Sequence, residues 1–188
     1  MDFKALSLDD CLMVKEWRNE TMNALRTPMM LTEEQQGKFY FDVVCDRDAK
    51  ARYWGIWEEV DGVLKTIFGT PVEKIKENGL IGMAGIENIE WENKRGEISL
   101  IIDPDRRGTG YGDDALAMLL DKGFNELNLE NIWGVCYECN PATEFWMRQI
   151  NKYNGKHVLF PNMKFCDGKY WRGLYFNFER SNYEPNNT

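Results

Sequence analysis

The chain has 188 residues, of which 43% are hydrophobic and 29% charged, a balance typical of one globular domain that buries its own core. Lysine and arginine number 23 against 31 aspartate and glutamate residues, so the net charge is −8. This charge disfavours nucleic acid or an anionic membrane surface as a partner, and no apolar run approaches the ~20 residues that span a bilayer.

The first half of the chain predicts two amphipathic helices followed by strands. Each helix starts with a capping pair, Ser7 with Asp10 and Thr32 with Gln35, at the spacing of a capping box. Residues 61–79 are punctuated by glycine and rich in lysine, which indicates an excursion or hairpin between strands. The predicted elements of this half are helices at 7–19 and 32–46 and strands at 52–58, 80–89 and 97–103.

The second half predicts helices and strands in alternation and then a hairpin. Asp167-Gly168 lies between the last two strands and is a hairpin signal. The order of elements favours an α/β or α+β fold with a mixed sheet flanked by helices. We expect one domain over residues 1–180 and a polar tail at 181–188. The predicted elements of this half are helices at 113–127 and 141–150 and strands at 132–138, 157–166 and 170–179.

A glycine-rich segment joins the predicted strand at 97–103 to the helix that follows it. Glycines occupy positions 108, 110 and 112, and Arg106 and Arg107 precede them. Glycines let backbone N–H groups approach an anion, and a helix N-terminus adds partial positive charge. The segment is therefore predicted to hold a pyrophosphate, with a tight structural turn as the alternative. No Gly-Lys-Ser/Thr follows, which excludes a P-loop, and the position after an antiparallel pair disfavours a Rossmann site.

The histidine and cysteine content limits other chemistry. His157 is the single histidine, so a zinc site with two histidines cannot be built. The five cysteines show no paired framework and no leader-like segment opens the chain, so we expect a reduced, cytoplasmic protein without a bound metal. Cys136 and Cys139 form one CxxC pair, but alternation in a strand sends residues i and i+3 to opposite faces, which favours buried thiols.

The glycine-rich segment resembles the signature of the GNAT superfamily, the acetyl-CoA-dependent N-acetyltransferases. Arg107-Gly-Thr-Gly-Tyr-Gly112 matches every fixed position of Gln/Arg-x-x-Gly-x-Gly/Ala. Trp17-Arg-Asn19 resembles the subgroup of ribosomal-protein N-terminal and amino-sugar N-acetyltransferases, and Leu80-Ile-Gly82, Gly96-Glu-Ile98 and Asn140-Pro-Ala142 follow in the family's usual order. The resemblance covers residues 2–180 and is specific for the superfamily, but not for a substrate.

The resemblance implies a mixed, strongly twisted sheet that splays between its fourth strand, at 96–103, and its fifth, at 131–138. Acetyl-CoA would be the co-substrate, and its pantetheine arm would pair with the backbone in the splay, with the Asn140 amide directed at it. Arg107 would add charge beside the pyrophosphate. The implied backbone contacts are Ile101, Ile102 and Asp103 for pantetheine, and Gly108, Thr109, Gly110, Tyr111 and Gly112 for the pyrophosphate.

One departure from the family concerns the general acid. The family often places a tyrosine seven residues after the asparagine, where this chain has Met147. Tyr153, Tyr137 and Tyr111 are the candidates for that role. The departure keeps two alternatives open, a CoA-binding regulatory module without catalysis and an acyltransferase that uses a different acyl-CoA.

Acetyl transfer requires a neutral acceptor amine. At pH 7 a lysine-like amine loses its proton at a cost of roughly 4.6 kcal/mol, and a peptide α-amine at about 1–1.4 kcal/mol. Glu97 is the first candidate base, since burial beside the thioester would raise its pKa; the alternative is a structural carboxylate paired with Arg95 or a backbone amide. Glu138 is the second candidate, with a solvated charge at a strand end as the alternative.

The charge distribution bears on the acceptor. Residues 1–94 hold 12 basic and 18 acidic residues, whereas residues 95–188 hold 11 and 13. In the family's fold the early helices wall the acceptor site, so an acidic wall suits a cationic amine, although acidity also serves solubility. We therefore expect either a small-molecule amine (amino sugar, polyamine or aminoglycoside-like) or a protein N-terminus. A homodimer is compatible with the family, but nothing in the sequence indicates an interface.

Overall fold

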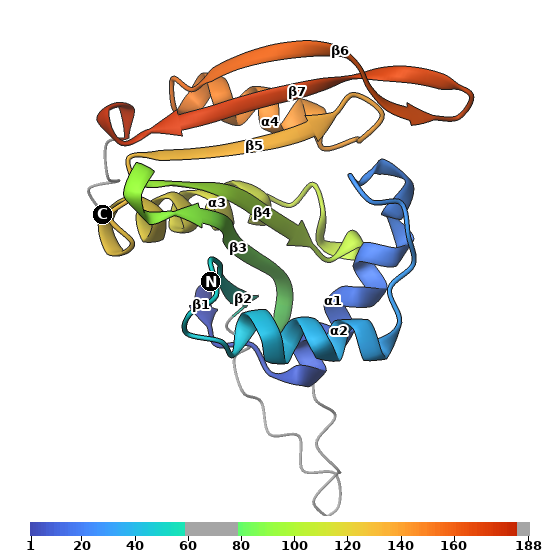
Figure 1. Ribbon diagram of the computed structural model, residues 1–188, viewed down its shortest axis with the longest axis vertical. Helices are drawn as coiled ribbons and strands as arrows, with labels where there is room; N and C mark the ends of the chain where they lie inside the picture. The colour runs from blue at the N-terminus through green and yellow to red at the C-terminus, as the bar shows by residue number, and fades with distance from the viewer. Residues whose placement is uncertain (59–78, 184–188) are drawn as a thin grey trace, which may run out of the picture.

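A computed structural model describes residues 1–58 and 79–183 and shows a mixed sheet packed between helices (Figure 1). Within these residues the sheet has seven strands in the order β1-β2-β3-β4-β5-β7-β6, and β4 and β5 are its parallel pair. The α/β class with a mixed sheet is confirmed. The helices are α1 (Leu8–Glu20), α2 (Glu33–Phe39), α3 (Tyr111–Asp121) and α4 (Thr143–Lys152), and the strands are β1 (Asp2–Lys4), β2 (Arg52–Trp57), β3 (Leu80–Glu90), β4 (Arg95–Ile102), β5 (Asn131–Tyr137), β6 (Lys156–Cys166) and β7 (Lys169–Glu179).

The two faces of the sheet bury separate hydrophobic clusters. On the face that we call the α3–α4 face, Leu116 and Trp146 pack with sheet residues such as Ile98. On the opposite face, the α1–α2 face, Val14 packs in a second cluster that Ile101 of β4 joins. Alternation along β4 thus sends Ile98 and Ile101 to opposite sides of the sheet. None of the helices in the described part of the chain is long and apolar enough to cross a bilayer.

Capping boxes start the two N-terminal helices where the sequence predicted. The Ser7 hydroxyl accepts from the Asp10 amide at 3.2 Å, and the Asp10 carboxylate accepts from the Ser7 amide at 2.8 Å. Thr32 and Gln35 repeat the arrangement at 3.2 and 2.9 Å. Each box satisfies N–H groups that have no partner inside the helix. The predicted helix at 32–46 is shorter as an α-helix, because it changes to a π-helical turn at Tyr40–Val44.

Other boundaries differ from the predicted ones. The short strand β1 was missed, because three residues carry too little pattern to predict. The predicted helix at 113–127 ends as an α-helix at Asp121 and continues as a π-helical turn at Lys122–Glu126. The predicted helix at 141–150 begins later, at Thr143, because the Asn140 side chain first accepts from the Ala142 amide at 2.9 Å.

The C-terminal hairpin is confirmed. Asp167 and Gly168 have φ values of 54° and 75°, as a tight two-residue hairpin turn requires. Tyr183, the last described residue, packs against Phe124 with ring centroids 5.2 Å apart. The predicted excursion at 61–79 lies, apart from Gly79, outside the described residues.

The strands β4 and β5 separate after three residues. They pair from Arg95 and Asn131 to Glu97 and Trp133, and then the pairing stops. Beyond that point β4 pairs only with β3, and β5 pairs only with β7, among the described strands. The predicted splay between the fourth and fifth strands is confirmed. After Glu97, the side of β4 that faces β5 therefore has no partner among the described strands.

Candidate active site

The glycine-rich segment after β4 ends at a helix start that no side chain of residues 1–58 or 79–183 caps. Asp103 first caps a 3-10 turn at Pro104–Arg106, accepting from the Asp105 amide at 3.0 Å. Gly108 and Gly110 follow with φ values of 78° and 97°, and a Cβ added at either would meet no atom of the described residues within 4 Å. These positions therefore favour glycine because of the backbone conformation, not because of crowding. Gly110 is also the N-cap of α3.

The amides of this segment point to an anion site. In the described part of the chain, none of the amides of residues 108–112 donates to a backbone carbonyl, and the first amides of a helix have no partner within it. Arg107 folds back, its Nε donating to the Ile102 carbonyl at 3.1 Å. Together with the helix N-terminus, this arrangement fits the pyrophosphate that the resemblance implies.

Two carboxylates near the segment have partners of their own. The Glu58 carboxylate accepts from the hydroxyl of Tyr111 and from Arg106 at 2.7 Å, and these contacts hold the pKa of Glu58 below its usual range. Asp113, in the first turn of α3, accepts from Nε2 of Gln149 at 2.6 Å. Both acidic charges are thus engaged by neighbouring side chains.

Glu97 is a buried carboxylate at the point where β4 and β5 separate. It is 3% exposed, and Arg26 donates to both of its oxygens, to Oε1 through Nη2 and to Oε2 through Nη1 at 3.5 Å. Asn88 donates to Oε2 at 2.8 Å. The arginine that pairs with Glu97 is therefore Arg26 and not Arg95, which pairs instead with Glu90 at 2.8 Å.

A second carboxylate, that of Glu87 on β3, lies opposite Glu97 in the register of the two strands. The hydroxyl of Tyr53 donates to it. Burial raises the pKa of Glu87, and the charge of Glu97 adds to this effect, while the hydrogen bond from Tyr53 opposes it. Burial also raises the pKa of Tyr53 well above its usual range, and Glu87 contributes.

Sequence reasoning missed Arg26, Glu87, Asn88 and Tyr53. The adjacent polar pair Glu87-Asn88 interrupts the otherwise apolar strand LIGMAGIENI. That interruption could have identified Glu87 and Asn88 as site residues. For Arg26 there was no signal, because it lies 71 residues from Glu97 in a polar stretch.

The other predicted catalytic residues lie elsewhere. Both oxygens of Glu138 accept from Arg172, at 2.6 and 2.8 Å, and this pairing holds the pKa of Glu138 below its usual range. Tyr153 packs against Phe178 of the α3–α4 cluster, on the opposite face of the sheet from Glu97. Its hydroxyl is buried and has no hydrogen-bond partner among residues 1–58 and 79–183.

Among the remaining tyrosine candidates, Tyr137 lies nearest the Glu97 cluster. Its hydroxyl is one of the groups that raise the pKa of Arg26, after Glu97 itself. Lys164 lies over the Tyr137 ring, 5.8 Å from its centroid. Tyr111 is engaged by Glu58 instead, and Met147 packs against the α3–α4 cluster.

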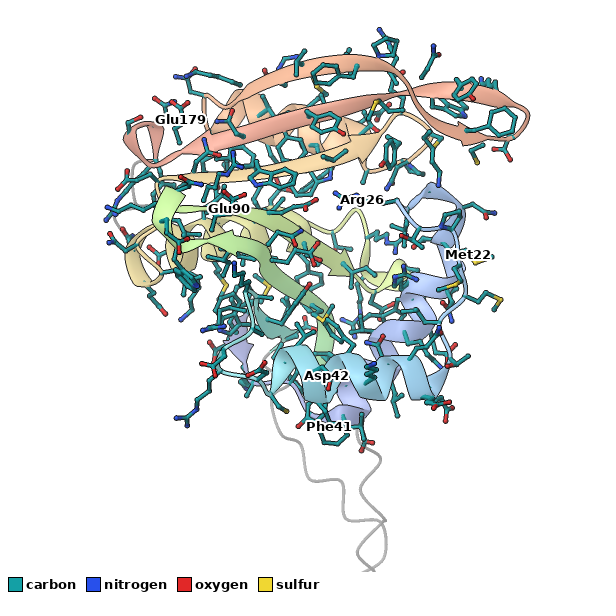
Figure 2. The ribbon with its side chains drawn as sticks, in the orientation of Figure 1. Met22, Arg26, Phe41, Asp42, Glu90 and Glu179 are labelled. Atoms are coloured by element: carbon teal, nitrogen blue, oxygen red, sulfur yellow. The ribbon has the colours of Figure 1, made fainter. Side chains whose placement is uncertain are left out.

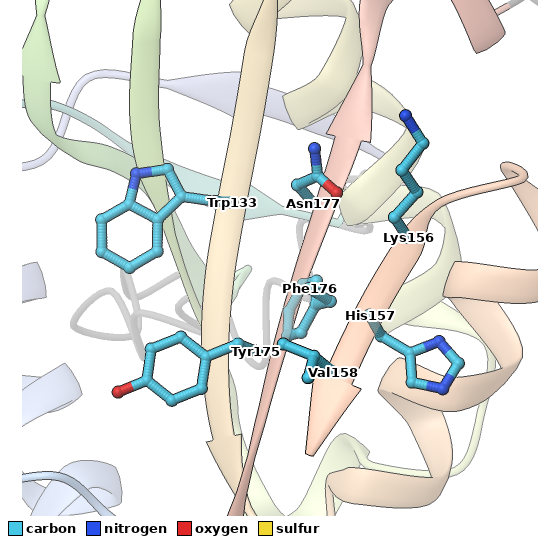
Figure 3. A pocket seen from close by; sticks show the side chains of 7 residues that line it. All are labelled: Trp133, Lys156, His157, Val158, Tyr175, Phe176 and Asn177. Carbon is cyan, nitrogen blue, oxygen red and sulfur yellow. The ribbon is translucent and has the colours of Figure 1, made fainter. Parts of the chain in front are cut away.

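An open, mostly apolar cavity of about 370 Å³ lies over β5, β6 and β7. Trp133, the register partner of Glu97, lines it together with Tyr175 and Val158. Figure 3 shows the rings of Trp133 and Tyr175 on the same side of the strands, while the His157 ring points away from them. The cavity thus places an aromatic surface on β5, the strand next to that of Glu97.

The cysteines and acidic residues do not form a metal centre in the part of the chain that the structure describes, where no three His, Cys, Asp or Glu side chains cluster suitably. Cys136 is buried on β5 and lies 3.5 Å from the hydroxyl of Thr143, and burial raises the pKa of its thiol. Cys139 lies beyond the end of β5 and is half-buried.

Comparisons with known proteins also point to the GNAT acetyltransferases. A family model described as the acetyltransferase (GNAT) domain matches residues 3–150. Spermidine N-acetyltransferase from Vibrio cholerae, solved in complex with CoA and spermine, superposes with a TM-score of 0.76 at 17% identity, covering 96% of each chain. Mutant forms of the spermidine/spermine N-acetyltransferase SpeG from the same organism give 0.72 at 19% identity, covering 97% of this chain and 95% of theirs. No curated protein matches the sequence significantly. Because the family model covers most of the chain, this protein belongs to the GNAT family of acetyltransferases.

Proposed function

We propose that this protein transfers the acetyl group of acetyl-CoA to a primary amine of a small cationic molecule, and that polyamines are the first acceptors to test. The observation that carries the proposal is the buried Glu97 at the start of the splay, on the same strand that leads into the glycine-rich segment. One strand thereby connects an anion-binding turn with a carboxylate that faces the α1–α2 side.

Acetyl-CoA would supply an activated thioester. The amides of Gly108 to Gly112 would hold its phosphates. The backbone of Ile101, Ile102 and Asp103, on the side of β4 where no described strand pairs, would pair with its arm. The side-chain oxygen of Asn140 is engaged by the Ala142 amide, so its NH2 group is the part that can face the arm. The chain's own groups thus fit the co-substrate.

The acceptor side calls for negative charge and a base. Glu97 and Glu87 lie opposite each other on the α1–α2 face and attract a protonated amine. Glu97 would then take the proton, directly or through water, which offsets part of the roughly 4.6 kcal/mol that a neutral alkylamine costs at pH 7. With Met147 at the usual tyrosine position, the buried Tyr137 is our candidate donor to the leaving thiolate. The solved spermidine acetyltransferases support a polyamine acceptor.

A peptide N-terminus is the second candidate acceptor. The aromatic cavity over β5, β6 and β7 favours it, because Trp133, Tyr175 and Val158 could receive an apolar side chain. An α-amine also needs less deprotonation than an alkylamine, about 1–1.4 kcal/mol at pH 7.

The test is CoA release from acetyl-CoA in the presence of spermidine, an amino sugar or a peptide with a free N-terminus. We expect amine-dependent release that is fastest with spermidine. If CoA release were fastest with the peptide, the acceptor would be a peptide N-terminus and not a polyamine. Micromolar binding of acetyl-CoA without turnover of any amine would instead support a non-catalytic CoA-binding module.

A further inference from the structure

The guanidinium of Arg26 covers the Glu97 carboxylate. The Glu97 side chain is 4% exposed, whereas that of Arg26 is 53% exposed, so Arg26 lies between the carboxylate and solvent. Arg26 and Asn88 together engage both carboxylate oxygens. Figure 2 shows Arg26 extending from the segment after α1 toward β4 and β5. An amine that approaches Glu97 from solvent therefore meets another cation first.

The segment 25–31, which carries this arginine, is held mainly by side chains of its neighbours. Lys164 of β6 donates to the Leu25 carbonyl at 2.6 Å, and Asn19 of α1 exchanges two hydrogen bonds with Leu31, at 3.0 and 2.8 Å. Within the described residues, the backbone of this segment makes no hydrogen bond to the backbone of any strand or α-helix. Such a segment can shift by exchanging single contacts, without opening a strand ladder.

The carboxylate of Glu97, which Arg26 covers, and that of Glu87 require a cation. Glu87 and Glu97 are register partners, and among the described residues they receive, besides Arg26, one neutral donor each, from Tyr53 and Asn88. A buried carboxylate that loses its counter-ion is strongly unfavourable. A neutral or anionic acceptor cannot compensate for the loss of Arg26, whereas a protonated amine can.

We propose that the Arg26 guanidinium occupies the place of the acceptor's ammonium group, and that a protonated amine enters the site by displacing it. This inference rests on the proposed function and restricts its acceptors to amines that arrive as cations. One cation replaces another at Glu97, so the charge of the buried cluster is conserved while the amine binds. Arg26 is thus a displaceable latch, that is, a cation that covers Glu97 until the acceptor binds. The amine is deprotonated after it has displaced Arg26 from Glu97.

The test is isothermal titration of the full chain with spermidine in the absence of acetyl-CoA. Arg26→Ala should bind spermidine about tenfold more tightly than the wild type, because no guanidinium has to be displaced. The matched control is Arg95→Ala, which removes the same charge from an exposed pair with Glu90 and should leave the affinity unchanged. Arg26→Lys keeps the charge with a single-point contact and should lie between wild type and Arg26→Ala, which keeps the test usable if the alanine variant fails to fold.

A parallel titration with acetyl-CoA separates this inference from the proposed function. Spermidine affinity that is unchanged or weaker in both Arg26 variants would show that Arg26 orients Glu97, and the latch would be wrong. Spermidine binding to neither wild type nor variants, with acetyl-CoA bound normally, would also contradict it. Failure of acetyl-CoA to bind the wild type would overturn the proposed function itself.

Discussion

The glycine-rich segment and the Glu97 cluster are built in different ways. The segment is one continuous stretch after β4, and its shape depends on two left-handed glycines and on a helix start that no described side chain caps. The cluster instead gathers side chains from β2, β3, β4 and the segment after α1, and its character depends on charge and burial. Binding should therefore depend on backbone conformation at one end of β4, and turnover on side-chain chemistry at the other.

The largest expected effect is at the cluster. Glu97→Gln keeps the shape of the side chain but removes the base, so amine-dependent CoA release should fall by about 10²- to 10⁴-fold. The affinity for acetyl-CoA should not change, because the glycine-rich segment is intact. Steady-state kinetics and calorimetric titration measure the two quantities separately.

Glu138→Gln is the matched control, because Glu138 is also a carboxylate paired with an arginine. Its pair lies at a strand end and is more exposed, so the rate should stay close to that of the wild type. Equal losses in both variants would mean that the buried cluster has no special part in turnover.

The next effect is at the glycine-rich segment. Gly110→Val places a β-branched residue at a φ of 97°, which costs about 1–2 kcal/mol in that region. The helix start should shift and acetyl-CoA affinity should fall by at least about tenfold. Gly37→Ala is the control, since that glycine lies in α2 and no atom of the described chain lies within 4 Å of its Cβ position. It should leave the affinity unchanged and raise stability by up to about 1 kcal/mol. An unchanged affinity for acetyl-CoA in Gly110→Val would mean that the segment is a structural turn and not a binding site.

The same contrast explains what the sequence could predict. The capping boxes, the glycine-rich segment and the hairpin at Asp167-Gly168 are encoded within about six residues each, and the structure has them where they were predicted. Glu97 was expected to act as a base through burial, and it is 3% exposed.

Contacts between distant segments could not be predicted. Arg26 was not identified because a polar stretch after a helix carries no sign of which carboxylate it will reach. Tyr153 was a candidate general acid by residue type, yet helix α4 packs on the α3–α4 face and carries it to the side away from Glu97. Side-chain direction around a sheet depends on which face each helix covers, and that is fixed only by the assembled fold.

The smallest expected effect concerns the pH dependence of stability. Burial raises the pKa of Glu87 in the folded protein, so the folded state holds that proton more tightly than the unfolded state. The resulting stability is present in full below the unfolded pKa, about 4.3, and is lost as the pH rises through the folded pKa. Glu87→Gln stays neutral and can still accept from Tyr53. Its stability relative to the wild type should therefore rise on going from pH 4 to pH 8.

Glu90→Gln, on the same strand, should change the pH dependence of stability in the opposite direction. The hydrogen bond from Arg95 holds the pKa of Glu90 below its usual range, so that carboxylate stabilises the fold above its unfolded pKa and loses this contribution as the pH falls. Chemical denaturation at a series of pH values should therefore show the two variants diverging from the wild type in opposite directions toward neutral pH. If Glu87→Gln instead became less stable than the wild type near pH 7, the Glu87 carboxylate would be stabilised by its surroundings. The hydrogen bond from Tyr53 and the charge of Arg26, which lower the pKa of Glu87, would then outweigh the effect of burial.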